Sequence, residues 1–112
     1  MTSISLLKQT IGYLLLFMVL SNNLVGANSN NFQNYSKKQG LAHTHVLSIF
    51  QDSKGFLWIG TFGGLNLFNG STFQIFTSKY GDTTTISSNP TNVIFEDKEG
   101  LMWFGTEYGL NK

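Results

Sequence analysis

The sequence predicts an all-β fold built from a four-stranded unit that recurs along the chain. The first observation is an internal repeat: residues 49–66 and 94–111 align without gaps, and 10 of the 18 paired positions are identical. The second is the offset of 45 residues between the copies, marked by Trp58 and Trp103. The third is the alternation of short apolar runs with turn-forming residues. A Gly/Trp repeat of about 40–50 residues is typical of the four-stranded blade of a β-propeller.

Residues 1–27 have the three-part order of a secretory signal peptide. Lys8 supplies the positive region, residues 11–20 are an apolar run of ten, and residues 24–27 offer small side chains before a cleavage site at Asn28. A run of ten is short for a bilayer-spanning helix, which needs about 20 residues. An uncleaved N-terminal anchor and a buried helix are the alternatives.

Residues 28–45 are rich in Asn, Ser and Gln and show no apolar period, so they are expected to form a lead-in segment. A flexible lead-in and a strand that closes the ring elsewhere are both open at this point. Phe32 and Tyr35 are candidates to anchor the segment.

The first predicted blade covers residues 46–76. Apolar runs rich in β-branched and aromatic residues predict four strands, at 46–51, 56–61, 65–68 and 72–76. Turns are expected between them, and Asn69-Gly70 predicts a tight hairpin because both residues tolerate a positive φ.

Residues 77–90 are polar and predict a connection between blades, after which residues 91–112 begin a second, truncated blade. Its strands are expected at 93–96 and 101–106, giving about one and a half blades in all. A single blade cannot bury both faces of its sheet, so about three or more repeats are needed for stability. The sequence therefore predicts the N-terminal piece of a longer protein.

The residues that recur have structural roles. Each tryptophan lies in the middle of a second strand and is expected to pack against the neighbouring blade. The glycines that follow suit a close approach of backbone, and the aspartates before the first turn are expected to accept backbone N–H groups. These residues are Trp58, Trp103, Gly60, Gly105, Asp52 and Asp97.

The repeat resembles the two-component regulator propeller repeat, whose pattern is roughly Val-x-x-Ile-x-x-Asp-x-x-Gly-x-Leu-Trp-Ile-Gly-Thr-x-x-Gly-Leu-Asn. The first copy matches at Val46, Ile49, Asp52, Gly55, Leu57, Trp58, Ile59, Gly60, Thr61, Gly64, Leu65 and Asn66. The second copy keeps nine of these positions and departs at Thr91, Met102 and Phe104.

This resemblance implies a periplasm-facing sensor of a hybrid two-component regulator. In such proteins two seven-bladed propellers precede an immunoglobulin-like domain, and a transmembrane helix and histidine kinase often follow. Many recognise oligosaccharides released from complex glycans. The resemblance thus implies an oligosaccharide ligand, further blades of the parent chain, a homodimer and a membrane link through a parent transmembrane helix.

Composition narrows the function classes. Only 12% of residues are charged, the formal net charge is +1, and no basic patch with interleaved aromatic residues is present, which argues against nucleic-acid binding by this segment. The absence of cysteine excludes disulfides and thiolate metal sites. We assign no catalytic residue, no metal ligand and no cofactor, and we expect no enzymatic activity in this chain.

Three sets of side chains were weighed as sites, and none identifies a ligand. His43 and His45 lack the third ligand that zinc requires and are interpreted as surface residues at the start of the blade. The carboxylates near the first turns are interpreted as turn-forming or solvated: Asp52, Asp97, Glu96 and Glu99. Side chains at the turn after the second strand are candidates for the mouth of a propeller channel: Phe62, Glu107, Tyr108 and Asn66.

Two other functions stay open on the sequence. One is a secreted propeller enzyme of the polysaccharide lyase or glycosidase type, which would require acid/base residues facing the channel. The other is a structural or protein-interaction propeller without a small ligand.

Overall fold

The computed structural model describes residues 2–21 and 30–112 and divides the chain into two compact units, residues 1–32 and 33–112. In the first unit, α1 (Thr2–Ser21) is one helix, and its large apolar side chains that the structure describes are exposed. No helix within residues 2–21 and 30–112 combines the length and hydropathy needed to cross a bilayer. The predicted cleavage site at Asn28 lies outside the described residues, so the signal peptide stays a prediction.

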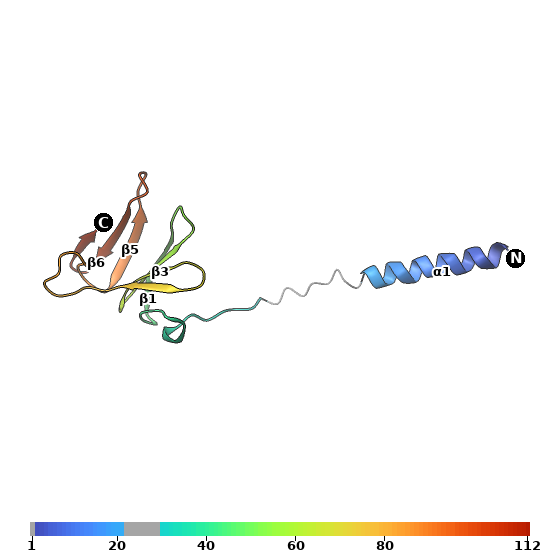
Figure 1. The fold of residues 1–112 in the computed structure, drawn as a ribbon, viewed down its shortest axis with the longest axis horizontal. Coiled ribbons are helices and arrows are strands. Elements are labelled where there is room, and N and C mark those ends of the chain that lie inside the picture. Colours follow the sequence, from blue (N-terminus) through green and yellow to red (C-terminus); the bar gives the residue numbers. More distant parts are fainter. Residues whose placement is uncertain (1, 22–29) are drawn as a thin grey trace. The chain divides into compact units, whose positions relative to one another are not determined.

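The second unit is mostly β and holds two antiparallel sheets (Figure 1). The first sheet has the order β1 (Val46–Gln51), β2 (Leu57–Thr61), β3 (Gly64–Phe68) and β4 (Phe73–Phe76). The second has the order β5 (Thr91–Glu96), β6 (Met102–Thr106) and β7 (Gly109–Asn111). The strands start within two residues of their predicted positions, and the second copy reaches a third strand.

The predicted hairpin at Asn69-Gly70 joins β3 to β4, but the backbone of its turn differs from the expected one. Gly70 has a φ of 96°, but Asn69 does not adopt a positive φ. Instead the Asn69 side-chain oxygen accepts hydrogen bonds from the backbone N–H groups of Ser71 (2.9 Å) and Thr72 (2.8 Å). The prediction was wrong in this detail because asparagine can also cap the backbone two or three residues on.

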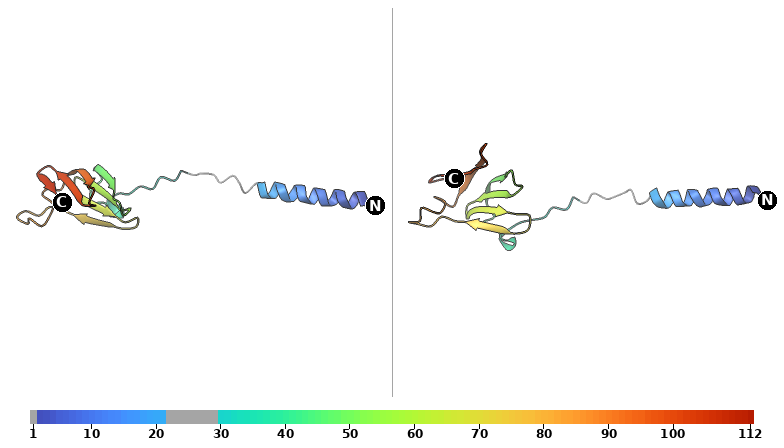
Figure 2. Two further views of the ribbon diagram at one scale, coloured as in Figure 1. Left: turned by 90° about the horizontal axis from the view of Figure 1, so that it is seen from above. Right: turned by 45° about the horizontal axis from the view of Figure 1, so that its top comes forward.

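The two sheets pack face to face, and residues 77–90 form a loop that leads from β4 to β5 (Figure 2). One face of the first sheet, bearing Trp58 and Leu65, covers Ile94 and Phe104 on the second sheet. The rings of Trp58 and Phe104 lie 5.0 Å apart between centroids. The expectation that Trp58 joins one blade to the next is confirmed.

Gly60 makes this close packing feasible. A Cβ atom at this position would overlap the carbonyl oxygen of Thr91, the first residue of β5. The Thr91 carbonyl also accepts a hydrogen bond from the Ser48 hydroxyl of β1 (2.9 Å). The expected close approach of backbone at Gly60 is therefore confirmed, and any side chain there would push the sheets apart.

The segment before β1 is held against the first sheet. The Tyr35 ring makes edge-to-face contacts with the rings of Phe68 on β3 and Phe73 on β4, at centroid distances of 5.2 Å and 5.9 Å. The short helix η2 (Lys37–Gln39) follows and carries a capping box. Tyr35 is thus an anchor, whereas Phe32 is fully exposed and is not.

Candidate functional site

The first turn of each copy is organised by one aspartate. Asp52 accepts hydrogen bonds from the backbone N–H groups of Lys54 and Phe56 (both 3.0 Å) and from the indole N–H of Trp58 (2.8 Å). Asp97 accepts the three equivalent bonds in the second copy, the indole bond again at 2.8 Å. The predicted role in the turn is confirmed, and the carboxylate also fixes the orientation of the tryptophan.

These contacts set the ionisation of both carboxylates. Partial desolvation raises the pKa of Asp52, but the hydrogen bonds from the Trp58 indole and two backbone amides bring it below the ordinary value of 3.8. The pKa of Asp97 is also lowered, chiefly by the Trp103 indole. Both groups are ionised acceptors at neutral pH, which does not suit a general acid. The missed clue in the sequence was the same Asp-to-Trp spacing of six residues in both copies.

Glu96 has a different role from the one expected. Its carboxylate accepts hydrogen bonds from the backbone N–H (2.8 Å) and the hydroxyl (2.5 Å) of Ser53 in the first copy. The interpretation of Glu96 as a turn-forming or solvated residue was wrong, because its side chain reaches across to the neighbouring sheet. Glu96 thus links the second copy to the turn between β1 and β2 of the first copy.

Asn66 is part of the scaffold and does not face a channel mouth. Its side chain is fully buried, its oxygen accepts from Ala42 N–H (2.9 Å), and its amide donates to the carbonyl of Ile59 (2.9 Å). Asn111 binds the backbone N–H of Ser87 in the same way (2.9 Å). Asn66 was therefore wrong as a candidate for the channel mouth, because its buried side chain is bonded to the segment before β1.

The two histidines and Phe62 form a small cluster at the other end of the first sheet. The Phe62 ring lies 6.0 Å from the ring of His43 and 4.8 Å from that of His45. His43 Nδ1 also accepts a hydrogen bond from His45 N–H (3.0 Å). Within residues 2–21 and 30–112, no group of three or more His, Cys, Asp or Glu side chains is placed to hold a metal ion. The Phe62 ring thus contacts both histidine rings while part of it stays exposed to solvent.

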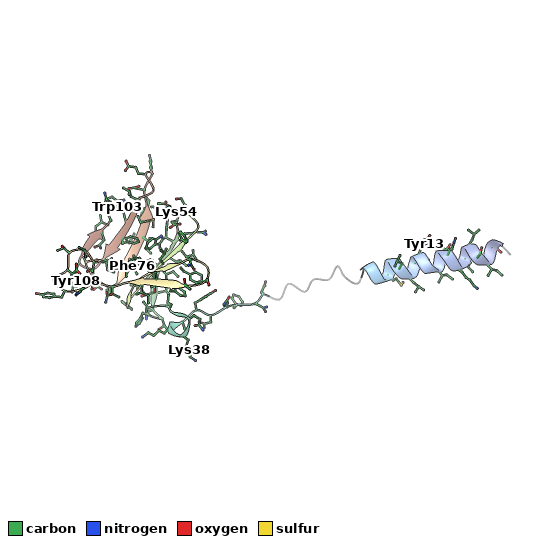
Figure 3. The ribbon with its side chains drawn as sticks, in the orientation of Figure 1. Tyr13, Lys38, Lys54, Phe76, Trp103 and Tyr108 are labelled. Atoms are coloured by element: carbon green, nitrogen blue, oxygen red, sulfur yellow. The ribbon has the colours of Figure 1, made fainter. Side chains whose placement is uncertain are left out.

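A hollow of about 600 Å³ lies at this same end, beside the second sheet. Its walls are residues 78–83 and 85–88 of the connection, together with Tyr108 and Asn111. Figure 3 shows Tyr108 and Lys54, which lies in the first turn, toward different ends of the sheets. Tyr108 is 81% exposed and Glu107 is also exposed. Of the four candidates for a channel mouth, only Tyr108 lines this hollow.

Comparison with known proteins identifies the repeat. A family model described as the two component regulator propeller matches residues 40–63 and 85–108. A curated relative, histidine kinase P4 of Formosa agariphila, is 42% identical over 74 residues. This match covers 65% of the present chain but 5% of that kinase, and the described residues contain no kinase domain.

Both matched segments start before the first strand of a sheet and end within the turn after its second strand. In each copy they therefore include the aspartate that binds the indole, the tryptophan itself and the glycine two residues after it. The resemblance seen in the sequence is confirmed: this chain carries two repeats of the two-component regulator propeller family and is partly homologous to a histidine kinase.

Proposed function

We propose that this chain is the periplasm-facing, ligand-sensing propeller segment of a two-component regulator. In the full-length parent it would recognise a glycan-derived oligosaccharide and control a cytoplasmic histidine kinase. The observation that carries the proposal is the pair of two-component regulator propeller repeats, in a chain with 42% identity to part of a histidine kinase.

The surface of the second sheet supports the part of the proposal that concerns further blades. Its free face is apolar and hollowed, and it is lined by Val93, Phe95, Trp103, Gly105 and Leu110. Three of these occupy the positions of Phe50, Trp58 and Leu65, which in the first sheet are packed against the second copy. A further blade of the parent chain, bringing its own equivalents of Ile94 and Phe104, would cover this face.

The location outside the cytoplasm rests on two supports. Proteins with these repeats typically place them on that side of the membrane. The predicted leader at residues 1–27 would direct the segment there. We further propose that ligand binding shifts the arrangement of a propeller homodimer and that a parent transmembrane helix transmits the change to the kinase.

Two measurements test this function, the first on a fusion of the present segment and the second on the full-length gene product. Fusion of alkaline phosphatase, which is active only after export, behind residue 112 should give an active reporter. Oligosaccharides from digested plant or algal polysaccharides should change kinase autophosphorylation in membrane vesicles that contain the gene product. An inactive reporter, or kinase activity indifferent to every oligosaccharide fraction, would contradict the proposal. Depolymerisation of a polysaccharide by the purified protein without ATP would instead favour a propeller enzyme.

A further inference from the structure

The connection between the copies forms a hollow whose side chains, apart from Asn111, are not those of the repeated scaffold. This connector hollow, the 600 Å³ space described above, is within the size range of about 300–1,000 Å³ typical of ligand pockets. Tyr80 comes from the connection, and Tyr108 stands where the first copy has Gly63. Since neither tyrosine belongs to the repeat motif, neither is needed to build a blade.

The wall made by the connection is internally bonded. Lys79 N–H donates to the Thr85 hydroxyl (3.0 Å), and Asp82 N–H donates to the Lys79 carbonyl (3.1 Å). The Asp82 carboxylate accepts from both the N–H (3.0 Å) and the hydroxyl (2.6 Å) of Thr84. A loop held by its own hydrogen bonds loses less conformational freedom when a ligand binds.

The connection is also fastened to the second sheet. Ser87 N–H donates to the Asn111 side-chain oxygen (2.9 Å), and the Ser87 hydroxyl lies 2.8 Å from the Thr106 hydroxyl. These bonds tie the connection to β6 and β7, next to the turn that carries Tyr108. The two tyrosines are therefore presented by elements that are joined to each other.

Both tyrosine rings are open to solvent. Tyr80 has the full exposure of an isolated side chain and Tyr108 is 81% exposed, and both line the connector hollow. A tyrosine has an apolar ring face and a polar hydroxyl, so it can stack on the C–H face of a sugar ring while hydrogen-bonding its hydroxyl groups. Two such rings on one hollow, whose lining also includes Thr and Ser residues, suit the apolar and polar surfaces of an oligosaccharide.

The hollow offers one charged group that can bind an acidic sugar. Its lining holds one cation, Lys79, and one anion, Asp82. The Thr84 hydroxyl and N–H both bond to one carboxylate oxygen of Asp82 and lower the pKa of that carboxyl group. Asp82 therefore stays ionised, and the two charges of the lining balance. Lys79 has no carboxylate partner within the part of the chain that the structure describes, so its ammonium is free to bind an anionic group.

We propose that the connector hollow binds a short oligosaccharide carrying a carboxylate or sulfate group, with Tyr80 and Tyr108 stacking on sugar rings and Lys79 pairing with the acidic group. This inference rests on the proposed recognition of an oligosaccharide and assigns it a site and a charge. Because the tyrosines are outside the repeated scaffold, sugar preference at this hollow can change without altering the blade.

The test uses the full-length gene product on an array of acidic oligosaccharides (oligogalacturonides and sulfated chondroitin fragments) and neutral cello-oligosaccharides. Wild-type protein should retain acidic members, and added salt should weaken this retention. Tyr80→Ala combined with Tyr108→Ala should lower affinity by about tenfold or more, and Lys79→Met by about tenfold for the acidic members alone. Phe32→Ala is the matched control, because Phe32 is an equally exposed aromatic residue outside the hollow.

Each outcome separates the site from the function. Retention of acidic sugars that is unchanged in the tyrosine and Lys79 variants would overturn the site while leaving the proposed function standing. Retention of neutral sugars alone would overturn the assigned charge. No retention of any oligosaccharide would contradict the proposed function as well. Equal thermal midpoints of variants and wild type show that losses of affinity do not come from unfolding, as expected for side chains this exposed.

Discussion

The two copies of the repeat share their local bonds but differ in which residues are buried. Ile49 is 64% exposed, whereas its counterpart Ile94 is 8% exposed. The order is reversed for Leu65, at 2%, and its counterpart Leu110, at 68%. In the register of the sheets, these isoleucines and leucines point to opposite faces of a blade. Burial in this fold is therefore supplied by the neighbouring copy, whereas the shape of each copy is supplied by its own sequence.

Substitution of the two equivalent leucines, Leu65 and Leu110, should give the largest difference in the free energy of unfolding between the copies. Leu65→Ala removes a side chain from the core between the sheets and should lower the free energy of unfolding by about 3 kcal/mol. Leu110→Ala in the same 112-residue chain should cost less than about 0.5 kcal/mol, because Leu110 is exposed. Urea unfolding of both variants measures the two costs. Equal costs would show that the free face of the second sheet is covered in solution.

Substitution of the equivalent glycines, Gly60 and Gly105, should give a smaller difference in stability, again with the larger loss in the first copy. Gly60→Ala forces a methyl group against the Thr91 carbonyl and should cost about 2 kcal/mol, as overpacking of a close contact does. Gly105→Ala places its methyl group only against Val93, with the nearest atom, Cβ, at 3.4 Å, and serves as the matched control with a much smaller loss. In a gene product where a further blade packs on the second sheet, the loss at Gly105 should rise toward that at Gly60. A Gly60→Ala variant as stable as wild type would contradict the close packing of the sheets.

The equivalent aspartates, Asp52 and Asp97, should contribute equally to the pH dependence of stability. The pKa of each carboxyl is lowered in the folded state, so each contributes stability that is present above the ordinary pKa of 3.8 and is lost as pH falls through the folded value. Asp52→Asn and Asp97→Asn should each weaken the loss of stability between about pH 5 and pH 3, and by similar amounts. Urea midpoints measured across this range test the prediction. A flattening at one site alone would show that the two turns are not equivalent.

The sequence predicted the features that lie within one copy better than those that depend on contacts between copies. Strand positions, the aspartate turns and the close approach at Gly60 depend on residues that are repeated at one offset, and the repeat revealed them. The role of Glu96 could not be predicted, because its partner Ser53 lies 43 residues away and belongs to the other copy. The burial of Asn66 depends likewise on Ala42, in a segment without a periodic pattern. Apart from Asn111, the connector hollow is formed by residues outside the repeat motif, so comparison of the copies gave no sign of it.

The most direct measurement is the rate of thiol labelling at the two pairs of positions in the 112-residue chain. The chain has no cysteine, so Ile49→Cys, Ile94→Cys, Leu65→Cys and Leu110→Cys each introduce a single reactive site. We expect fast maleimide labelling at positions 49 and 110 and slow labelling at 94 and 65, so that the faster-labelled copy differs between the two pairs. Equal rates within each pair, in a chain whose far-UV circular dichroism shows β structure, would contradict it, because burial would then depend on the position in the repeat and not on the neighbouring copy.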